Sequence, residues 1–240
     1  MLKNLLAFLL LSIPHFSFSQ KLEVEKKAMK NEEGITVDSW VAHVDQDIAY
    51  STTTLSEFLK KTFNAKGEKK NKNMMLVSKT TFSEISNLRM DMRAMFALES
   101  GGTAIAFMFS PGYDLHFGEE FRREEFAKAE EFVKNFLRFH YKYFYDEQTK
   151  KIQSKLKDVQ GDILSNDKKI ERNNTSMRDY ETKMIAEGAD VEKLREKKSK
   201  LEKENENIAN NTVKKKEEIT KLEDDLVKIS EAMKNVSDYK

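Results

Sequence analysis

The tail contains the stretch ITKLEDDLVKISEAMKNV, residues 219–236, in which apolar side chains alternate at spacings of three and four residues. This is the heptad repeat of an α-helical coiled coil, whose first and fourth positions, a and d, face a partner helix. The same phase extends back to Ile152 without a slip. Its apolar a and d positions are Leu156, Val159, Ile163, Ile170, Met177, Tyr180, Met184, Val191, Leu194, Leu201, Ile208, Ile219, Leu222, Leu226, Ile229, Met233 and Val236. So long a seam needs another helix to cover it.

Two architectures could supply that helix. A continuous helix over residues 152–236 would need a second chain, whereas a helical hairpin folded near Gly188 would cover its own seam. Gly188 costs about 1 kcal/mol inside a helix, and Asp190 could cap a second helix. However, Met184 and Val191 keep the heptad phase across the glycine, which a loop has no reason to do. We therefore favour a continuous or kinked helix, with the hairpin as the alternative.

Polar residues interrupt the seam at seven a or d positions, which are Asn166, Asn173, Glu187, Lys198, Asn205, Thr212 and Lys215. Buried asparagine can fix the register and the number of helices at some cost in stability. A loosely packed, partly hydrated middle is the alternative. A hairpin folded at Gly188 would set Asn166 opposite Asn210. The apolar ends, residues 152–163 and 219–236, should hold most of the association energy, because a buried methylene contributes ~0.8 kcal/mol and a surface ion pair ~0.3–0.5 kcal/mol.

The first 19 residues have the pattern of a secretory signal peptide. Lys3 supplies the positive charge, residues 5–13 form an apolar core, and residues 17–19, Ser-Phe-Ser, give a small-x-small cleavage site before Gln20. That core is shorter than the roughly 20 apolar residues that cross a bilayer. Gln20 also stands where a bacterial lipoprotein would have cysteine. We therefore expect a mature chain that begins near Gln20, has no transmembrane helix and is periplasmic or secreted.

The composition narrows the classes of partner. Lys and Arg total 42 and Asp and Glu total 41, so the formal net charge is only +1, and no whole-chain attraction to nucleic acid follows. The chain has no cysteine, which excludes a disulfide framework. Stability must come from packing and association.

Residues 20–118 have the periodicity of strands. Residues 88–98 alternate apolar and polar side chains, residues 99–102 supply a turn, and residues 103–110 return as the second strand of a hairpin. The other predicted elements are two strands at residues 22–29 and 35–44 that pair across residues 31–34, a strand at residues 74–82, a helix at residues 55–63 and a basic linker at residues 66–72. The predicted fold class is α+β, with a small antiparallel sheet covered by helices on one face and followed by a long helical coiled coil.

An aromatic-rich helix should connect the sheet domain to the coiled coil. Phe132, Phe136, Phe139 and Tyr143 form a stripe on one helical face that could cover the sheet. The predicted domains are a signal peptide (1–19), an α+β sheet domain (20–118), the connecting helix (119–146) and the coiled coil (147–240).

Several stretches together resemble an uncharacterised family of exported bacterial proteins with this layout. They are Gly34-Ile35-Thr36-Val37-Asp38, Leu55-Ser56-Glu57-Phe58-Leu59-Lys60, Phe82-Ser83-Glu84-Ile85-Ser86, Phe109-Ser110-Pro111-Gly112-Tyr113 and the final coiled coil. The resemblance covers nearly all of the mature chain. It implies export and the architecture above, but no activity, ligand or catalytic residue.

No catalytic, cofactor-binding or metal-binding residue can be assigned from motifs. The chain lacks the Gly-x-Ser-x-Gly motif of α/β hydrolases, the Gly-x-Gly-x-x-Gly phosphate loop and the His-Glu-x-x-His zinc motif. We therefore expect neither an enzyme nor a cofactor.

The methionines of the sheet region are candidate copper ligands. They are Met74, Met75, Met90, Met92, Met95 and Met108. With His43 or His116 their thioethers could bind Cu(I) outside the cytoplasm. However, the alternation places Met90 and Met92 on the same face as Phe96, and methionine is a flexible core filler. We favour packing.

The run from Phe136 to Tyr145 interleaves aromatic and basic side chains and could stack on bases or lie at lipid headgroups. Nucleic acid is not an expected partner outside the cytoplasm. We favour a packing role, with contact to a membrane surface as the alternative.

Two functional hypotheses follow. The first is an exported structural or interaction protein of the cell envelope that forms homo-oligomers, or binds a partner protein, through its coiled coil. The second is a module that binds a small ligand or a peptide in the sheet domain and uses the coiled coil to dimerise.

Overall fold

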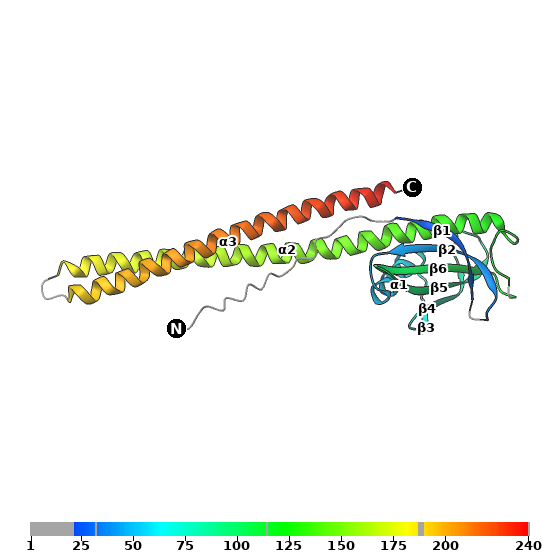
Figure 1. Cartoon of the computed structure of the whole chain (residues 1–240), viewed down its shortest axis with the longest axis horizontal. Helices are drawn as coiled ribbons and strands as arrows, with labels where there is room; N and C mark the ends of the chain where they lie inside the picture. Colours follow the sequence, from blue (N-terminus) through cyan, green and yellow to red (C-terminus); the bar gives the residue numbers. More distant parts are fainter. Residues whose placement is uncertain (1–21, 32, 114, 187–189, 240) are drawn as a thin grey trace. The chain divides into compact units, whose positions relative to one another are not determined.

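The computed structural model describes residues 22–31, 33–113, 115–186 and 190–239. Its elements, in chain order, are β1 (Val24–Lys30), β2 (Thr36–Val44), α1 (Ile48–Phe63), β3 (Glu68–Asn71), β4 (Met74–Thr81), β5 (Arg89–Glu99), β6 (Gly102–Ser110), α2 (Arg123–Met184) and α3 (Val191–Asp238). The six strands form one antiparallel sheet in the order β1-β2-β6-β5-β4-β3 (Figure 1). The predicted fold class, an antiparallel α+β domain followed by a long helical region, is confirmed.

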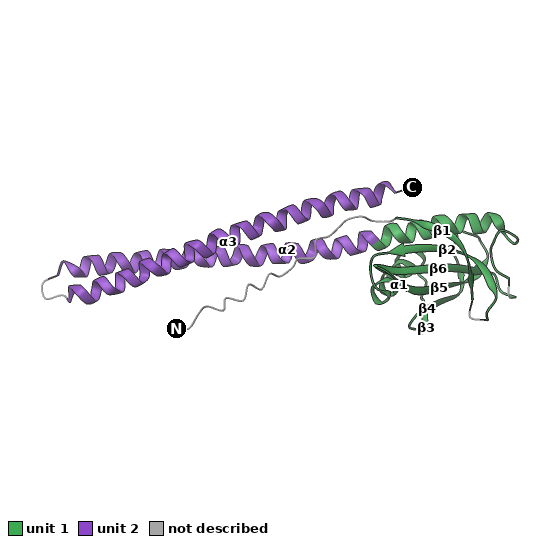
Figure 2. Cartoon of the chain, in the orientation of Figure 1, with its two compact units in different colours: residues 1–140, 240 green, residues 141–239 purple. Residues whose placement is uncertain are grey.

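The chain divides into two compact units (Figure 2), which are described separately. The first, here called the head, comprises the described residues up to His140, and the second, the hairpin, comprises Tyr141–Tyr239. The division lies within α2, inside the segment predicted to connect the domains (residues 119–146).

The head is organised around the predicted β5–β6 hairpin. β5 pairs with β6 from Asp91 opposite Ser110 to Glu99 opposite Gly102, so the turn lies at the expected residues. The predicted pairing of the first two strands is also confirmed, because β1 pairs with β2 from Val24 opposite Ala42 onward.

Three predicted boundaries are wrong. The basic linker at residues 66–72 contains β3, an exposed edge strand whose lysines discourage pairing with further chains. α1 begins at Ile48 rather than Leu55, because Asp47 caps it by accepting a hydrogen bond from the Tyr50 amide at 2.7 Å. α2 begins at Arg123 rather than Glu119.

An aromatic core lies between the helices and one face of the sheet. Phe132 of α2, fully buried, is its centre. Five other rings have centroids 5.3–6.1 Å from that of Phe132, and they belong to Phe58, Phe63, Phe82, Phe107 and Phe109. α1 and the first part of α2 therefore cover this face, as the stripe of aromatic residues predicts.

The opposite face of the sheet carries a smaller apolar cluster. Its buried members are Val37, Val41, Ala104, Ala106 and Met108, with Met29 and Met95 packed against them. The turn between β1 and β2 reaches toward this face, because Glu33 lies 4.0 Å from the guanidinium of Arg93 on β5. The sheet thus buries side chains on both faces.

The favoured continuous helix is wrong, and the helical hairpin is what the structure has. α2 ends at Met184 and α3 begins at Val191 and runs antiparallel to it (Figure 1). Asp190 caps α3 by accepting a hydrogen bond from the Lys193 amide at 3.1 Å. Gly188, the predicted turn residue, lies outside the described residues.

An unbroken heptad phase is compatible with a hairpin, so the phase does not favour a continuous helix. Asn166, a d residue, bonds to Thr212, an a residue, and Asn173, a d residue, bonds to Asn205, an a residue. Val191, where α3 begins, is seven residues after Met184, where α2 ends, so both arms stay in phase. The predicted opposition of Asn166 and Asn210 is displaced slightly, to Asn211 and Thr212.

The seam itself is confirmed by burial. Every described a and d position between Ile152 and Val236 is buried or half-buried. The asparagines of the middle pair across the hairpin, with Asn166 Nδ2 3.0 Å from Thr212 Oγ1 and Asn173 Nδ2 2.9 Å from Asn205 Oδ1. These bonds support the prediction that polar seam residues fix the register.

Candidate functional site

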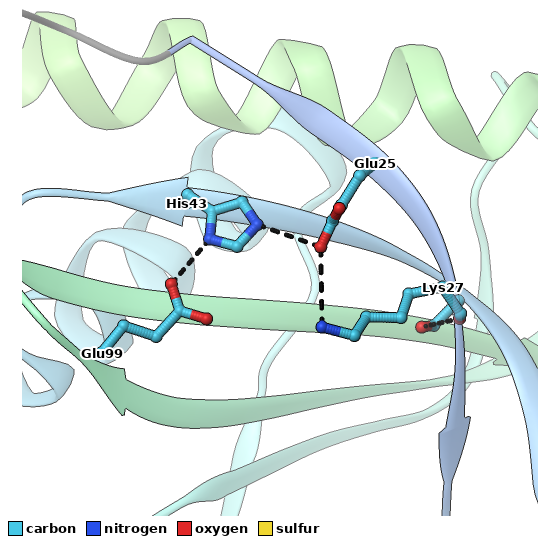
Figure 3. Close-up of polar contacts among 5 residues, drawn as sticks. Glu25, Lys27, His43 and Glu99 are labelled. Carbon is cyan, nitrogen blue, oxygen red and sulfur yellow. Dashed lines mark hydrogen bonds and ion pairs between the residues drawn. The ribbon is translucent and has the colours of Figure 1, made fainter.

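His43 lies at the centre of a polar group on the sheet of the head (Figure 3). Its Nδ1 is 2.8 Å from Glu99 Oε2 on β5, and its Nε2 is 3.3 Å from Glu25 Oε1 on β1. The ammonium of Lys27 is 3.7 Å from the same Glu25 oxygen. The group thus connects three strands, β1, β2 and β5.

Small residues on β6 let Glu99 reach His43. β6 lies between β2 and β5, and its Ala104 is opposite His43 while its Gly102 is opposite Glu99. A Cβ on Gly102 would lie 1.9 Å from the carbonyl oxygen of Val44. Only glycine therefore fits at the start of β6, and no long side chain blocks the path between imidazole and carboxylate.

A pocket of about 360 Å³ opens beside this group. It is lined by Glu23, His43, Val44, Asp45, Glu99, Ser100, Gly101, Gly102 and Thr103. Three carboxylates and one imidazole in this lining suit a ligand that carries positive charge or several hydrogen-bond donors.

The protonation of His43 decides how this group is bonded. An imidazole donates from both nitrogens only when it is protonated, whereas the neutral ring has one N–H. His43 can therefore donate to Glu25 and Glu99 together only as a cation. Because both ring nitrogens face carboxylates, neither is aimed at a hydroxyl in the way a general base is aimed at its nucleophile.

A cation entering the pocket would compete with His43 for the carboxylates. Among the residues that the structure describes, no group of three or more His, Cys, Asp or Glu side chains is placed to hold a metal ion.

His140 forms a second polar group, buried within the head. Its Nδ1 is 2.7 Å from the Thr54 hydroxyl, and its Nε2 is 2.6 Å from Gln46 Oε1. Burial lowers the pKa of His140 from 6.5 to about 3. The neutral ring donates from Nε2 to Gln46 and accepts at Nδ1 from Thr54. It joins α2 to α1 and to the loop before α1, which is a structural role.

The methionines are distributed over both faces of the sheet. Met92 and Met75 are fully buried toward the helices, whereas Met108 belongs to the cluster on the opposite face. The burial is what the packing interpretation predicts. Both ring nitrogens of His43, one of the proposed copper ligands, are engaged by carboxylates.

Three of the six large rings in the run from Phe136 to Tyr145 are buried, and the other three are half-buried. Phe136 is fully buried in the head, and Tyr141 and Tyr145 are 1% and 2% exposed. Rings buried this far are not available to stack on bases or to enter a lipid layer, so the burial favours the packing role.

Sequence motifs did not reveal the group around His43. The predicted β1–β2 hairpin could have placed Glu25 near His43, because hairpin pairing fixes the register. The approach of Glu99 depends on the strand order, which places β6 between β2 and β5, and on the small residues of β6. No local motif encodes that order.

No family model, curated protein or solved structure matches the chain. The resemblance to exported bacterial proteins therefore stays a hypothesis. No helix among the described residues is long and apolar enough to cross a membrane.

Proposed function

We propose that the chain is an exported interaction protein of the cell envelope that binds its partners through the outer faces of the helical hairpin. The observation that carries this proposal is the closed seam. Asn166 with Thr212 and Asn173 with Asn205 pair within one chain, so the helices need no other chain in order to fold. α2 has 62 residues, of which those from Tyr141 onward belong to the hairpin, and α3 has 48. Two paired helices of this length offer a long surface for binding.

Export is the first part to test. The signal-peptide pattern predicts cleavage after Ser19. Intact-mass spectrometry of the protein purified from the envelope fraction should give a chain that begins at Gln20. A protein that keeps Met1 and stays with the cytoplasmic fraction would contradict export.

Binding through the hairpin can be tested by site-specific photocrosslinking in the cells that produce the protein. A photoreactive residue at Ser199, exposed on α3, should give crosslinked adducts, whereas one at Lys72, exposed in the head, should not. Both substitutions replace exposed side chains, so they form a matched pair. Adducts from Lys72 alone would place binding in the head and contradict the proposal.

A second function is favoured by the pocket beside His43. Its acidic lining supports a module that binds an organic cation in the head and uses the hairpin to dimerise. Equilibrium dialysis of the full chain against a panel of small amines and guanidinium compounds would test this function. Glu99→Gln should weaken any binding severalfold, whereas Glu57→Gln, remote from the pocket, should leave it unchanged.

A further inference from the structure

The two long sides of the hairpin differ in what covers them. On one side, residues that directly precede a positions pair across the helices: Lys155 with Glu218 at 3.0 Å, and Lys169 with Glu204 at 2.7 Å. These are heptad g positions, and their ion pairs cover that side. In an antiparallel pair, the e and b positions of both helices then lie together on the other side, here called the b/e face.

The b/e face carries exposed apolar side chains. Within the described part of the hairpin, the large apolar residues with exposed side chains are Leu164 (57%), Ile185 (86%), Val213 (57%) and Val227 (58%). Each directly follows an a residue, so all four occupy b positions. Their shared position makes them one face rather than a scatter of exposed residues.

Leu164 and Val213 form the centre of this face. Asn166, two residues after Leu164, bonds to Thr212, the residue just before Val213. The two apolar side chains therefore lie at the same level on neighbouring helices. They make an apolar patch in the middle of the hairpin, with α2 and α3 each contributing one residue.

Opposite charges flank this patch along α2. Lys157 and Glu171 occupy the b positions one heptad before and one heptad after Leu164, and both are exposed. Neither forms an ion pair with a residue that the structure describes. A second hairpin laid antiparallel across the patch would bring Lys157 of one copy to Glu171 of the other, whereas a parallel copy would bring like charges together.

The charges of the whole b/e face are distributed in the same way as Glu171 and Lys157, with acidic residues toward the turn and basic residues away from it. Toward the turn, at residues 165–186 and 190–212, the b and e positions hold six acidic and two basic residues, namely Asp167, Glu171, Glu181, Glu192, Glu202 and Glu206, with Arg178 and Arg195. Glu181 and Glu202 pair with Lys198 of the seam, so four acidic residues remain for a second copy. Away from the turn, at residues 141–163 and 214–239, they hold four basic and two acidic residues, namely Lys150, Lys157, Lys216 and Lys234, with Asp146 and Glu223. An antiparallel copy would set the acidic half against the basic half.

We infer that a second copy of this chain docks antiparallel on the b/e face, about a two-fold axis that passes through Leu164 and Val213. The inference rests on the proposed function and names the partner and the surface. The two hairpins form a four-helix bundle in which the apolar patch of each copy meets that of the other.

Sedimentation equilibrium of the full mature chain tests this inference. The wild type should have twice the mass of one chain at micromolar concentration. Leu164→Asp combined with Val213→Asp should raise the dissociation constant of the dimer by about tenfold or more, because it buries charge at the centre of the interface. Leu98→Asp, at an exposed apolar residue of the head, is the matched control and should leave the dimer unchanged.

A charge exchange tests the antiparallel arrangement. Lys157→Glu and Glu171→Lys should each weaken the dimer, and the two together in one chain should restore it, because the opposed pair is rebuilt with reversed sign. Circular dichroism checks that each variant keeps its helices. A wild-type monomer overturns the inference. So does a dimer whose dissociation constant is unchanged by both the patch variants and the charge variants. Photocrosslinks from Ser199 to a different protein, together with a monomer in solution, would overturn the inference and leave the proposed function standing.

Discussion

The head and the hairpin bury their apolar surface in different ways. In the head, Phe132 has five aromatic neighbours drawn from α1, from β6 and from the segment after β4. In the hairpin, a single row of seam residues from each helix is covered, and polar pairs such as Asn173 with Asn205 occupy part of it. The head therefore concentrates its stability in a few side chains, whereas the hairpin spreads it along its length and specifies register with polar bonds.

Replacing the centre of the aromatic core should have the largest effect. Phe132→Ala removes a fully buried ring and leaves a cavity that five neighbours line, so we expect a loss of about 3–5 kcal/mol in the free energy of unfolding of the head. The single tryptophan, Trp40, stacks on Phe126 at 5.2 Å and reports head unfolding by fluorescence in urea titrations. Leu98→Ala, at a side chain 75% exposed, should change the free energy of unfolding of the head little. Equal stabilities for the two variants would show that the core is not centred on Phe132.

Acid should destabilise the head through His140. The pKa of His140 is about 3 in the folded head and near 6.5 when the chain is unfolded, so between these values the unfolded chain binds a proton that the folded head does not. The contribution of His140 is therefore complete above pH 6.5 and decreases as the pH falls, by about 2 kcal/mol at pH 5.

Unfolding curves of the wild type and of His140→Gln between pH 7 and pH 5 separate this effect from other titrations. The free energy of unfolding of the variant should fall less steeply as the pH decreases, by a slope that corresponds to about one proton, whatever its stability at pH 7. Parallel pH profiles would show that His140 is already protonated in the folded head or is not the group responsible.

Features with local physical causes could be predicted from the sequence, whereas features that depend on residues remote in sequence could not. The β5–β6 hairpin and the seam follow from periodicities of two and of three to four residues, which reflect backbone geometry. The buried pairing of His140 could not be predicted, because its partners, Thr54 and Gln46, are remote in sequence. The choice between hairpin and continuous helix could not be made from the phase, because Met184 at the end of α2 and Val191 at the start of α3 are seven residues apart, as in an unbroken heptad repeat.

Substitutions in the polar layers of the hairpin should have a smaller effect on stability. Whether they destabilise depends on whether the residue bonded across the helices is also replaced. Asn173→Leu leaves Asn205 half-buried without its cross-helix donor and should cost about 1–3 kcal/mol. Asn173→Leu with Asn205→Leu replaces the pair by apolar contact and should restore or exceed the wild-type stability, with a looser register. Thermal unfolding followed by circular dichroism at 222 nm measures both. Additive losses in the double variant would mean that the two residues do not act as a pair.

Capping of α3 should give the smallest effect. Asp190 accepts the Lys193 amide at 3.1 Å, so Asp190→Ala leaves that amide without its partner and should cost about 1 kcal/mol. Asp190→Asn keeps an acceptor at the same place and should recover most of the loss. Because the turn is where the hairpin departs from a continuous helix, the cap also tests why the chain folds back. If Asp190→Ala raised the helical content and converted the protein to a larger oligomer, the cap would be what selects the hairpin, and the effect would exceed the loss of one hydrogen bond.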